Sequence, residues 1–389
     1  MEKEETKTRA HALLSPSASH RWLNCTAAPL LEEKMPNKDT DYTKEGTLAH
    51  AYCAKALKGL LGRRTVAEDE EIAQLHGAYF TNDMLDHVET YATIVGDKYT
   101  RAVRKVKDSV LLVEERLDFT RWVPESFGTA DALVISDDLM EVIDFKYGKG
   151  VEVSATWNPQ MMIYALGALA AFEDEYNIRR VRMTIIQPRL NNLSEFEIEV
   201  AGLKWWAGNV LTPKAEEAIS GKGKQYTGEW CRFCRCKTTC AKLAGECFAI
   251  AEQFADKETV SDEDMATVIL PKLATIKAWA SAMEEYALDE ALKGKQYEGY
   301  KLVEGRSIRK ITDPAELAAR LLDNGFERDK IYKPEELETI TTLEKLVGKK
   351  TFAELSKGVV DKPAGKPTLV PESDKREALN SAQNDFKDF

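Results

Sequence analysis

A cysteine run and a pair of strand carboxylates are the parts of this chain best suited to chemistry. Cys231, Cys234 and Cys240 form a C-x2-C-x5-C run, and Cys25 lies more than two hundred residues upstream. Four thiolates can hold either a Zn²⁺ ion or a [4Fe–4S] cluster. A zinc site usually takes its ligands as two local pairs, whereas three ligands are local here and the best fourth is remote. This arrangement favours an iron–sulfur cluster that ties an N-terminal helix to the helices around the run.

The remaining cysteines leave a zinc site open as the alternative. Cys236 or Cys247 could replace Cys25 in an all-local zinc site, and Cys53 is expected in the core. The first residues, MEKEETK, lack the apolar core of a secretory signal, so the seven cysteines are not expected to form a disulfide framework. The expected role of the cluster is structural, because metal binding contributes folding free energy.

The carboxylates Asp131 and Asp144 flank a hairpin signal at Asp137-Asp138. If these two residues form the loop, Asp131 lies directly opposite Asp144, with Cβ atoms about 4.5–5.5 Å apart. Two carboxylates at that distance repel unless a cation such as Mg²⁺ or Mn²⁺ lies between them. Lys146 emerges on the same face as Asp144 and could approach an attacking water or a phosphate. The alternative is a surface carboxylate pair with Lys146 as its ion-pair partner.

Hydrophobic periodicity indicates the elements that position these groups. Predicted helices begin at Ser15 and Pro159 and also cover 46–61, 70–106, 204–219 and 248–295, and predicted strands cover 110–119, 130–135, 140–145, 181–186 and 196–200. This order predicts an α/β fold with a mixed central sheet flanked by helices and a mainly helical C-terminal extension. The predicted parts are a disordered N-terminus (1–12), a main domain (13–247), a mainly helical region (248–360) and a flexible tail (361–389).

Four short motifs in this order resemble those of the RecB/AddB-type branch of the PD-(D/E)XK nucleases. They are Glu45-Gly-Thr-x-Ala-His50, Gly128-x-x-Asp131, Asp144-x-Lys146 and Gln160-x-x-x-Tyr164. The CRISPR adaptation nucleases of that branch carry a similar cysteine pattern, and the whole layout resembles an uncharacterised phage and prophage family. The resemblance covers residues 13–247 and implies a restriction-endonuclease-like core. Ala130 departs from the proline that many members have before the first aspartate.

The resemblance implies a role for each matching residue. His50, Asp131, Asp144 and the main-chain carbonyl of Phe145 would bind the metal, and one imidazole among oxygen ligands makes Mn²⁺ at least as acceptable as Mg²⁺. The implied catalytic residues are Asp131, Asp144, Lys146, Gln160 and Tyr164, and the implied DNA contacts are Gln160, Tyr164 and Arg189. Glu114 is a candidate ligand for a second metal, with an ordinary surface strand charge as the alternative.

These observations predict a metal-dependent deoxyribonuclease, specifically an exonuclease, that acts on single strands or DNA ends in phage recombination or replication. Its expected partners are DNA, phage replication or recombination proteins and further copies of itself. The net charge of −11 argues against indiscriminate coating of nucleic acid, but a narrow basic groove is compatible with it. No run approaches the ~20 apolar residues of a membrane span, so a cytoplasmic protein is expected. The alternatives are a catalytically inactive DNA-binding or scaffold protein with the nuclease fold, and a zinc-stapled interaction protein.

Overall fold

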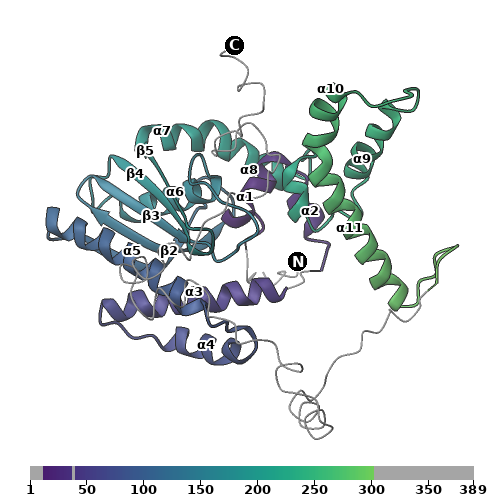
Figure 1. Ribbon diagram of the computed structural model, residues 1–389. Helices are drawn as coiled ribbons and strands as arrows, with labels where there is room; N and C mark the ends of the chain where they lie inside the picture. Colours follow the sequence, from purple (N-terminus) through teal and green to yellow (C-terminus); the bar gives the residue numbers. More distant parts are fainter. Residues whose placement is uncertain (1–11, 37–39, 302–389) are drawn as a thin grey trace, which may run out of the picture. The chain divides into compact units, whose positions relative to one another are not determined.

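A mixed sheet of five strands lies at the centre of the computed structural model, which describes residues 12–36 and 40–301 (Figure 1). The strands follow one another across the sheet in chain order: β1 (Val110–Asp118), β2 (Phe127–Ser136), β3 (Leu139–Phe145), β4 (Arg180–Gln187) and β5 (Asn192–Glu199). Only β3 and β4 are parallel, and α6 (Pro159–Phe172) connects them, as a parallel crossover requires. The predicted α/β fold with a mixed sheet is confirmed.

The hairpin between β2 and β3 has the predicted register. Ser136 pairs with Leu139, and the pairing continues to Ala132 opposite Ile143. Asp137 has a left-handed backbone (φ 52), as a two-residue hairpin loop requires. The next opposed positions in this register belong to Asp131 and Asp144, so the turn chemistry alone brings the two carboxylates to adjacent strands.

One face of the sheet is covered by helices from the N-terminal third of the chain, α3 (Asp41–Leu60) and α5 (Met84–Lys105), with α4 (Val66–Tyr79) packed on α3 (Figure 1). The helical prediction for 70–106 is confirmed in large part, but the segment forms two helices. The backbone of Phe80 is extended, and Thr81-Asn82-Asp83 separates α4 from α5. Short polar side chains favour such a break because they bond to nearby backbone groups.

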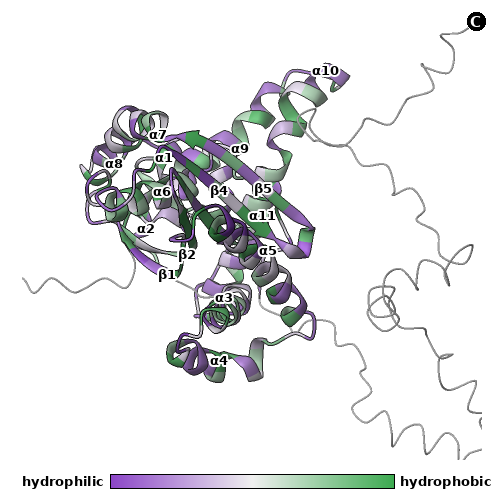
Figure 2. Cartoon of the chain, turned by 90° about the vertical axis from the view of Figure 1, so that its left-hand side faces the viewer, coloured by the Kyte–Doolittle hydropathy of each residue, from purple (hydrophilic) through white to green (hydrophobic). Residues whose placement is uncertain are grey.

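The other face is covered by α6 and by short elements from residues 16–24 and 200–219. These are η1 (Pro16–Ala18), α1 (Ser19–Asn24), α7 (Val200–Trp206), a π-helical turn η3 (Ala207–Leu211) and α8 (Thr212–Ile219). The side chain of Asn158 caps α6 by accepting from the N–H groups of Gln160 (3.1 Å) and Met161 (3.3 Å). Figure 2 shows hydrophobic residues concentrated in the central strands, which are covered on both faces.

The remaining described elements are short or helical. They are α2 (Ala28–Glu32), η2 (Pro188–Leu190), η4 (Glu229–Phe233), α9 (Ala241–Gln253), α10 (Asp262–Asp264), η5 (Met265–Ile269) and α11 (Leu270–Leu292). The helical prediction for 248–295 is therefore confirmed in large part. The predictions of a disordered segment over residues 1–11, of a mainly helical region from 302 to 360 and of a tail at 361–389 lie outside the described residues. None of the helices in the described ranges combines the length and apolar character that crossing a bilayer requires.

Gly167, in the middle of α6, marks a close approach between helix and sheet. A Cβ at this position would lie 2.4 Å from Cε1 of Phe119 and 3.1 Å from Cβ of Leu117. We expect Gly167→Ala to lower the free energy of unfolding by about 1–3 kcal/mol, because overpacking displaces the ring or the helix. Urea denaturation measures this change.

Gly96 provides the matched control, because it lies in the middle of α5. Its added Cβ would meet only Cδ1 of Leu60, at an ordinary 3.6 Å. Gly96→Ala should raise the free energy of unfolding by up to about 1 kcal/mol through helix propensity. Stabilisation by both substitutions would contradict the close contact at Gly167.

Candidate metal centre

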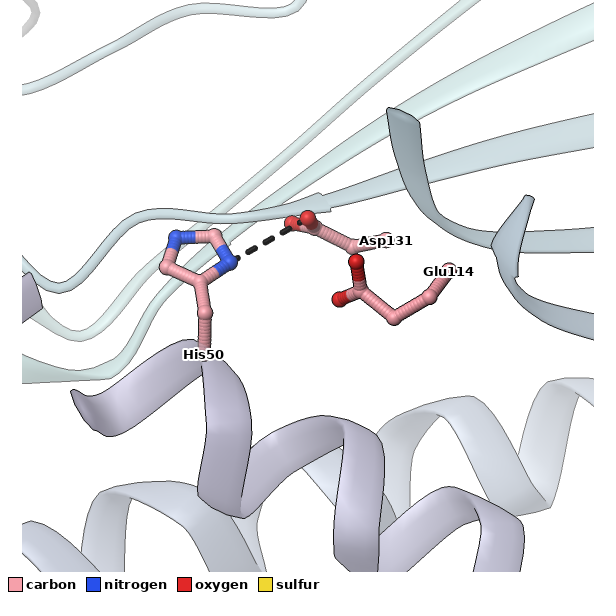
Figure 3. A group of neighbouring side chains, drawn as sticks. All are labelled: His50, Glu114 and Asp131. Atoms are coloured by element: carbon pink, nitrogen blue, oxygen red, sulfur yellow. Dashed lines mark hydrogen bonds and ion pairs between the residues drawn. The ribbon is translucent and has the colours of Figure 1, made fainter. Parts of the chain in front are cut away.

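Three side chains from three different elements converge beside the sheet (Figure 3). His50 of α3, Glu114 of β1 and Asp131 of β2 each offer one ligand atom, and these atoms all lie within 4.8 Å of one another. Nδ1 of His50 is 3.1 Å from Oδ1 of Asp131, and all three residues are half-buried. One imidazole and two carboxylates form a donor set suited to Mn²⁺ or Mg²⁺.

The backbone of Glu114 places this carboxylate in the group. Its φ of 55° is left-handed, although its neighbours pair regularly with β2, Val113 with Ala132 and Glu115 with Ala130. Before Glu114, Val113 packs with α3 and α5, whereas after it Leu117 packs with α6. In a regular strand, alternate side chains such as those of Val113 and Leu117 point to the same face of the sheet. Here they point to opposite faces, so the side-chain alternation is reversed at Glu114. Such a non-glycine conformation costs about 1–3 kcal/mol, and strain of this kind concentrates at functional sites.

Asp144, Lys146 and Gln160 form a second polar group next to the first. Nζ of Lys146 lies 2.9 Å from Oδ2 of Asp144 and donates to Oε1 of Gln160 at 3.0 Å. Nε2 of Gln160 donates to Oδ1 of Asp144 at 3.3 Å. Oδ2 of Asp144 is buried and accepts no well-directed hydrogen bond, so it retains a lone pair that could bind a cation.

The structure therefore distributes the sequence-predicted ligands over two adjacent groups. His50 and Asp131 lie together, and Glu114 joins them, while the carboxylate of Asp144 is held by Lys146 and Gln160. The backbone N–H of Phe145 donates to Oδ2 of Asp131 at 2.7 Å. This bond links the metal group to β3, and metal ligation by the carbonyl of Phe145 stays a prediction.

The charges of the centre shift the pKa values of its members. Burial alone would lower the pKa of His50, but the Asp131 carboxylate raises it to about 9. Burial and the charge of Asp131 raise the pKa of Glu114 to about 7. Burial also raises the pKa of Asp144, with the ammonium of Lys146 opposing this effect. The imidazolium of His50 thus supplies the positive charge that these carboxylates need when no metal is bound.

Metal binding should therefore release protons. At pH 7.5 the metal-free centre holds His50 protonated and Glu114 partly protonated, whereas metal ligation requires a neutral imidazole and an ionised carboxylate. Since His50 loses its proton only as the pH rises through about 9, Mn²⁺ affinity should increase with pH from about 7 to 9. Calorimetric titration with Mn²⁺ in two buffers of different ionisation enthalpy measures the release. His50→Gln should remove most of it, and equal heats in both buffers would exclude His50 as a ligand.

The other predicted contacts, Tyr164 and Arg189, are mostly covered by protein. The ring of Tyr164 packs against that of Phe119. A Cβ at position 128 would lie 3.2 Å from both rings, so the close packing favours glycine at this position of the motif. Nη1 of Arg189 donates to Oε1 of Glu45 at 3.0 Å, and its side chain is 13% exposed. This bond ties Arg189 to the helix that carries His50, and a DNA contact of Arg189 stays a prediction.

The cysteines meet in one enclosed cavity. Its wall contains Cys25, Cys231, Cys234, Cys236 and Cys240, together with Arg21, Trp230 and Leu243. The backbone N–H of Leu243 donates to Sγ of Cys240 at 3.5 Å, so this cysteine caps α9. The structure thus brings the remote Cys25 to the run, and Cys247 is absent from the wall. Cys236, which the sequence suggested only as a replacement ligand, is a fifth thiol of the cavity.

Hydrogen bonds across the chain hold this cavity together. Nε of Arg21 donates to Oε2 of the buried Glu32 at 2.9 Å, and Oε1 of Glu32 accepts from the N–H of Arg235 at 2.7 Å. A Cβ at Gly223 would lie 2.4 Å from the carbonyl oxygen of Thr26, so glycine is required at this close approach. These protein contacts therefore attach the N-terminal segment to the cysteine run.

The spacing of the sulfur atoms bears on the group that they could hold. Among the residues that the structure describes, the cysteines form no group of three whose sulfur atoms all lie within 4.8 Å. Tetrahedral zinc with bonds of about 2.3 Å would hold its sulfur ligands about 3.8 Å apart. Three of these thiols would therefore have to lie closer together to bind one zinc ion.

Two comparisons with known proteins bear on the chain. A family model described as "Protein of unknown function (DUF2800)" matches residues 11–377. A solved structure titled "Crystal structure of SSO0001" is similar at 15% sequence identity and a TM-score of 0.22, over 57% of this chain and 96% of that one. A similarity at this level does not bear on function.

Proposed function

The chain belongs to the DUF2800 family, whose description assigns no function, and from its site we propose that it is a metal-dependent nuclease that hydrolyses DNA phosphodiester bonds. One observation supports this most strongly: the His50–Glu114–Asp131 group lies beside the Asp144–Lys146–Gln160 group. Carboxylates that converge with an imidazole and an ammonium are what a metal-assisted hydrolase of a phosphate ester needs. The arrangement is similar to that expected for the RecB/AddB-type branch of the PD-(D/E)XK nucleases.

In this proposal four side chains, His50, Glu114, Asp131 and Asp144, would hold Mg²⁺ or Mn²⁺. The convergence of the first three supports the assignment, as does the oxygen of Asp144 that accepts no well-directed hydrogen bond. A bound divalent cation would supply Lewis acidity to a phosphate oxygen and lower the pKa of a bound water. The remaining chemistry falls to residues of the chain.

Lys146 would act as a cation in this site. Burial would lower its pKa, but the carboxylate of Asp144 raises it above its ordinary value, so Lys146 keeps its proton at neutral pH. A protonated amine cannot remove a proton from water, and it does stabilise negative charge on a phosphate. Asp144 and Gln160 fix the position of Nζ, and we assign to Lys146 the stabilisation of charge that develops in the transition state.

The cysteine cavity would hold a [4Fe–4S] cluster through Cys25, Cys231, Cys234 and Cys240. The meeting of these residues in one wall supports this assignment. The role of the cluster would be structural, because it would join the segment after α1 to the start of α9 and contribute folding free energy.

Anaerobic purification followed by cleavage of end-labelled DNA tests the proposal. We expect cleavage of single-stranded DNA or of duplex ends with Mg²⁺ or Mn²⁺, and none with excess EDTA. DNA binding without cleavage under either metal would favour the inactive scaffold alternative. Zinc without iron in the purified protein would favour the zinc-stapled alternative.

A further inference from the structure

Trp157 combines backbone strain with exposure. It is the third residue of a turn closed by the N–H of Asn158, which donates to the carbonyl of Ala155 at 3.2 Å. Its φ is 52°, a conformation that favours glycine and is an outlier for a bulky residue. The residue is 58% exposed although its ring lies 5.3 Å from that of Phe196. Burial of the ring therefore does not explain why tryptophan occupies this position.

The loop that carries Trp157 is held tightly to the β4–β5 hairpin. Oε1 of the buried Gln187 accepts from the N–H of Val153 at 3.1 Å, and its Nε2 donates to the carbonyls of Gly148 (2.6 Å) and Val151 (2.9 Å). Further bonds of 2.8 and 2.9 Å join Asn192 and Ser194 to this loop. The exposed ring is thus presented by a backbone that has few alternative conformations.

The loop also begins and ends at the candidate site. It starts directly after Lys146 and ends at Asn158, which caps α6, and Gln160 follows with bonds to both Lys146 and Asp144. The three residues from Trp157 to Gln160 span at most about 10 Å of chain. Trp157 is therefore a near neighbour, along the chain, of a residue of the candidate site.

We propose that Trp157 is a stacking platform for an unpaired base of the strand held at the metal centre, an inference that rests on the proposed function. Every base offers a flat face, so stacking on a rigid indole binds single strands with little sequence preference. Rigidity increases the effect, because the ring loses little freedom when the base arrives. The bonds between the loop and the β4–β5 hairpin keep the strained turn and its exposed ring in place.

Binding of a fluorescently labelled single-stranded oligonucleotide, followed by anisotropy in Ca²⁺, tests the proposal. Trp157→Gly should weaken binding about 5- to 150-fold, the range found when a stacking aromatic is removed. Glycine adopts the left-handed conformation without strain, so this variant should unfold at the same temperature as the parent or higher. Trp157→Phe should recover part of the affinity because it keeps an aromatic face.

Trp205→Ala is the matched control, because Trp205 of α7 is 64% exposed and lies in an ordinary helix. Its affinity for the oligonucleotide should equal that of the parent. Unchanged affinity in Trp157→Gly, or the same loss in Trp205→Ala, would overturn the stacking proposal, as would a parent protein that does not bind the oligonucleotide. If the parent cleaves DNA and Trp157→Gly binds the oligonucleotide with the parental affinity, the stacking role is refuted and the nuclease proposal stands. If Trp157→Gly loses affinity but the parent does not cleave DNA, the nuclease proposal is refuted and the stacking role stands.

Discussion

Replacing Lys146 with alanine should slow DNA cleavage by about 10²–10³-fold or more, the effect of removing one group that stabilises transition-state charge. The ammonium of Lys146 is fixed 2.9 Å from Asp144 and 3.0 Å from Gln160, so no other side chain can take its place without rearrangement. DNA binding should change little, because one contact among many phosphate contacts is lost. Single-turnover rates on end-labelled DNA with Mg²⁺ and Mn²⁺ measure the effect.

Two further variants separate chemistry from folding. Loss of Lys146 leaves the buried Asp144 without its cation, which destabilises a protein. Asp144→Asn keeps the size of the side chain and leaves the unpaired charge on Lys146, which is 26% exposed to solvent. It should slow cleavage to a similar extent, because an amide is a poor ligand for the metal. Lys107→Ala, at an exposed position outside the helices and strands, should cleave like the parent. Cleavage at the parental rate by both site variants would exclude this centre as the active site.

Serine at Cys25, Cys231, Cys234 or Cys240 should remove bound iron together with the visible absorbance of the cluster. It should also lower the free energy of unfolding by about 4 kcal/mol. This is the stabilisation by a ligand whose free concentration is a thousand times its dissociation constant. The reason is that the cavity joins segments more than two hundred residues apart, and the bound group would be a direct link between them. Iron analysis and thermal unfolding under anaerobic conditions measure both effects.

Cys236 and Cys247 supply the comparison for the cysteine series. Cys247→Ser should retain iron, because Cys247 is absent from the cavity wall. Cys236→Ser should retain iron as well if the predicted four cysteines are the ligands, although Cys236 is buried in the same wall. Loss of iron in Cys236→Ser, together with retention of iron in Cys25→Ser, would show that Cys236 rather than Cys25 is the fourth ligand.

The sequence determined the parts of the site that depend on local chemistry. The turn at Asp137-Asp138 sets the register of β2 and β3, and this register places Asp131 and Asp144 on adjacent strands. Apolar residues on both faces of these strands predicted a covered sheet, and the structure confirms it. Such features follow from a few neighbouring residues, because alternation and turn conformation are properties of short segments.

Only the tertiary structure decided which groups meet. The sequence gives no signal for the left-handed backbone of Glu114, because the position holds neither glycine nor asparagine. This backbone brings the carboxylate of Glu114, rather than that of Asp144, into one group with His50. Cys236 joins Cys25 in one wall because contacts around Glu32 hold distant segments together. These outcomes depend on packing between segments far apart in the chain, where a strained residue or a buried pair persists only because its surroundings enforce it.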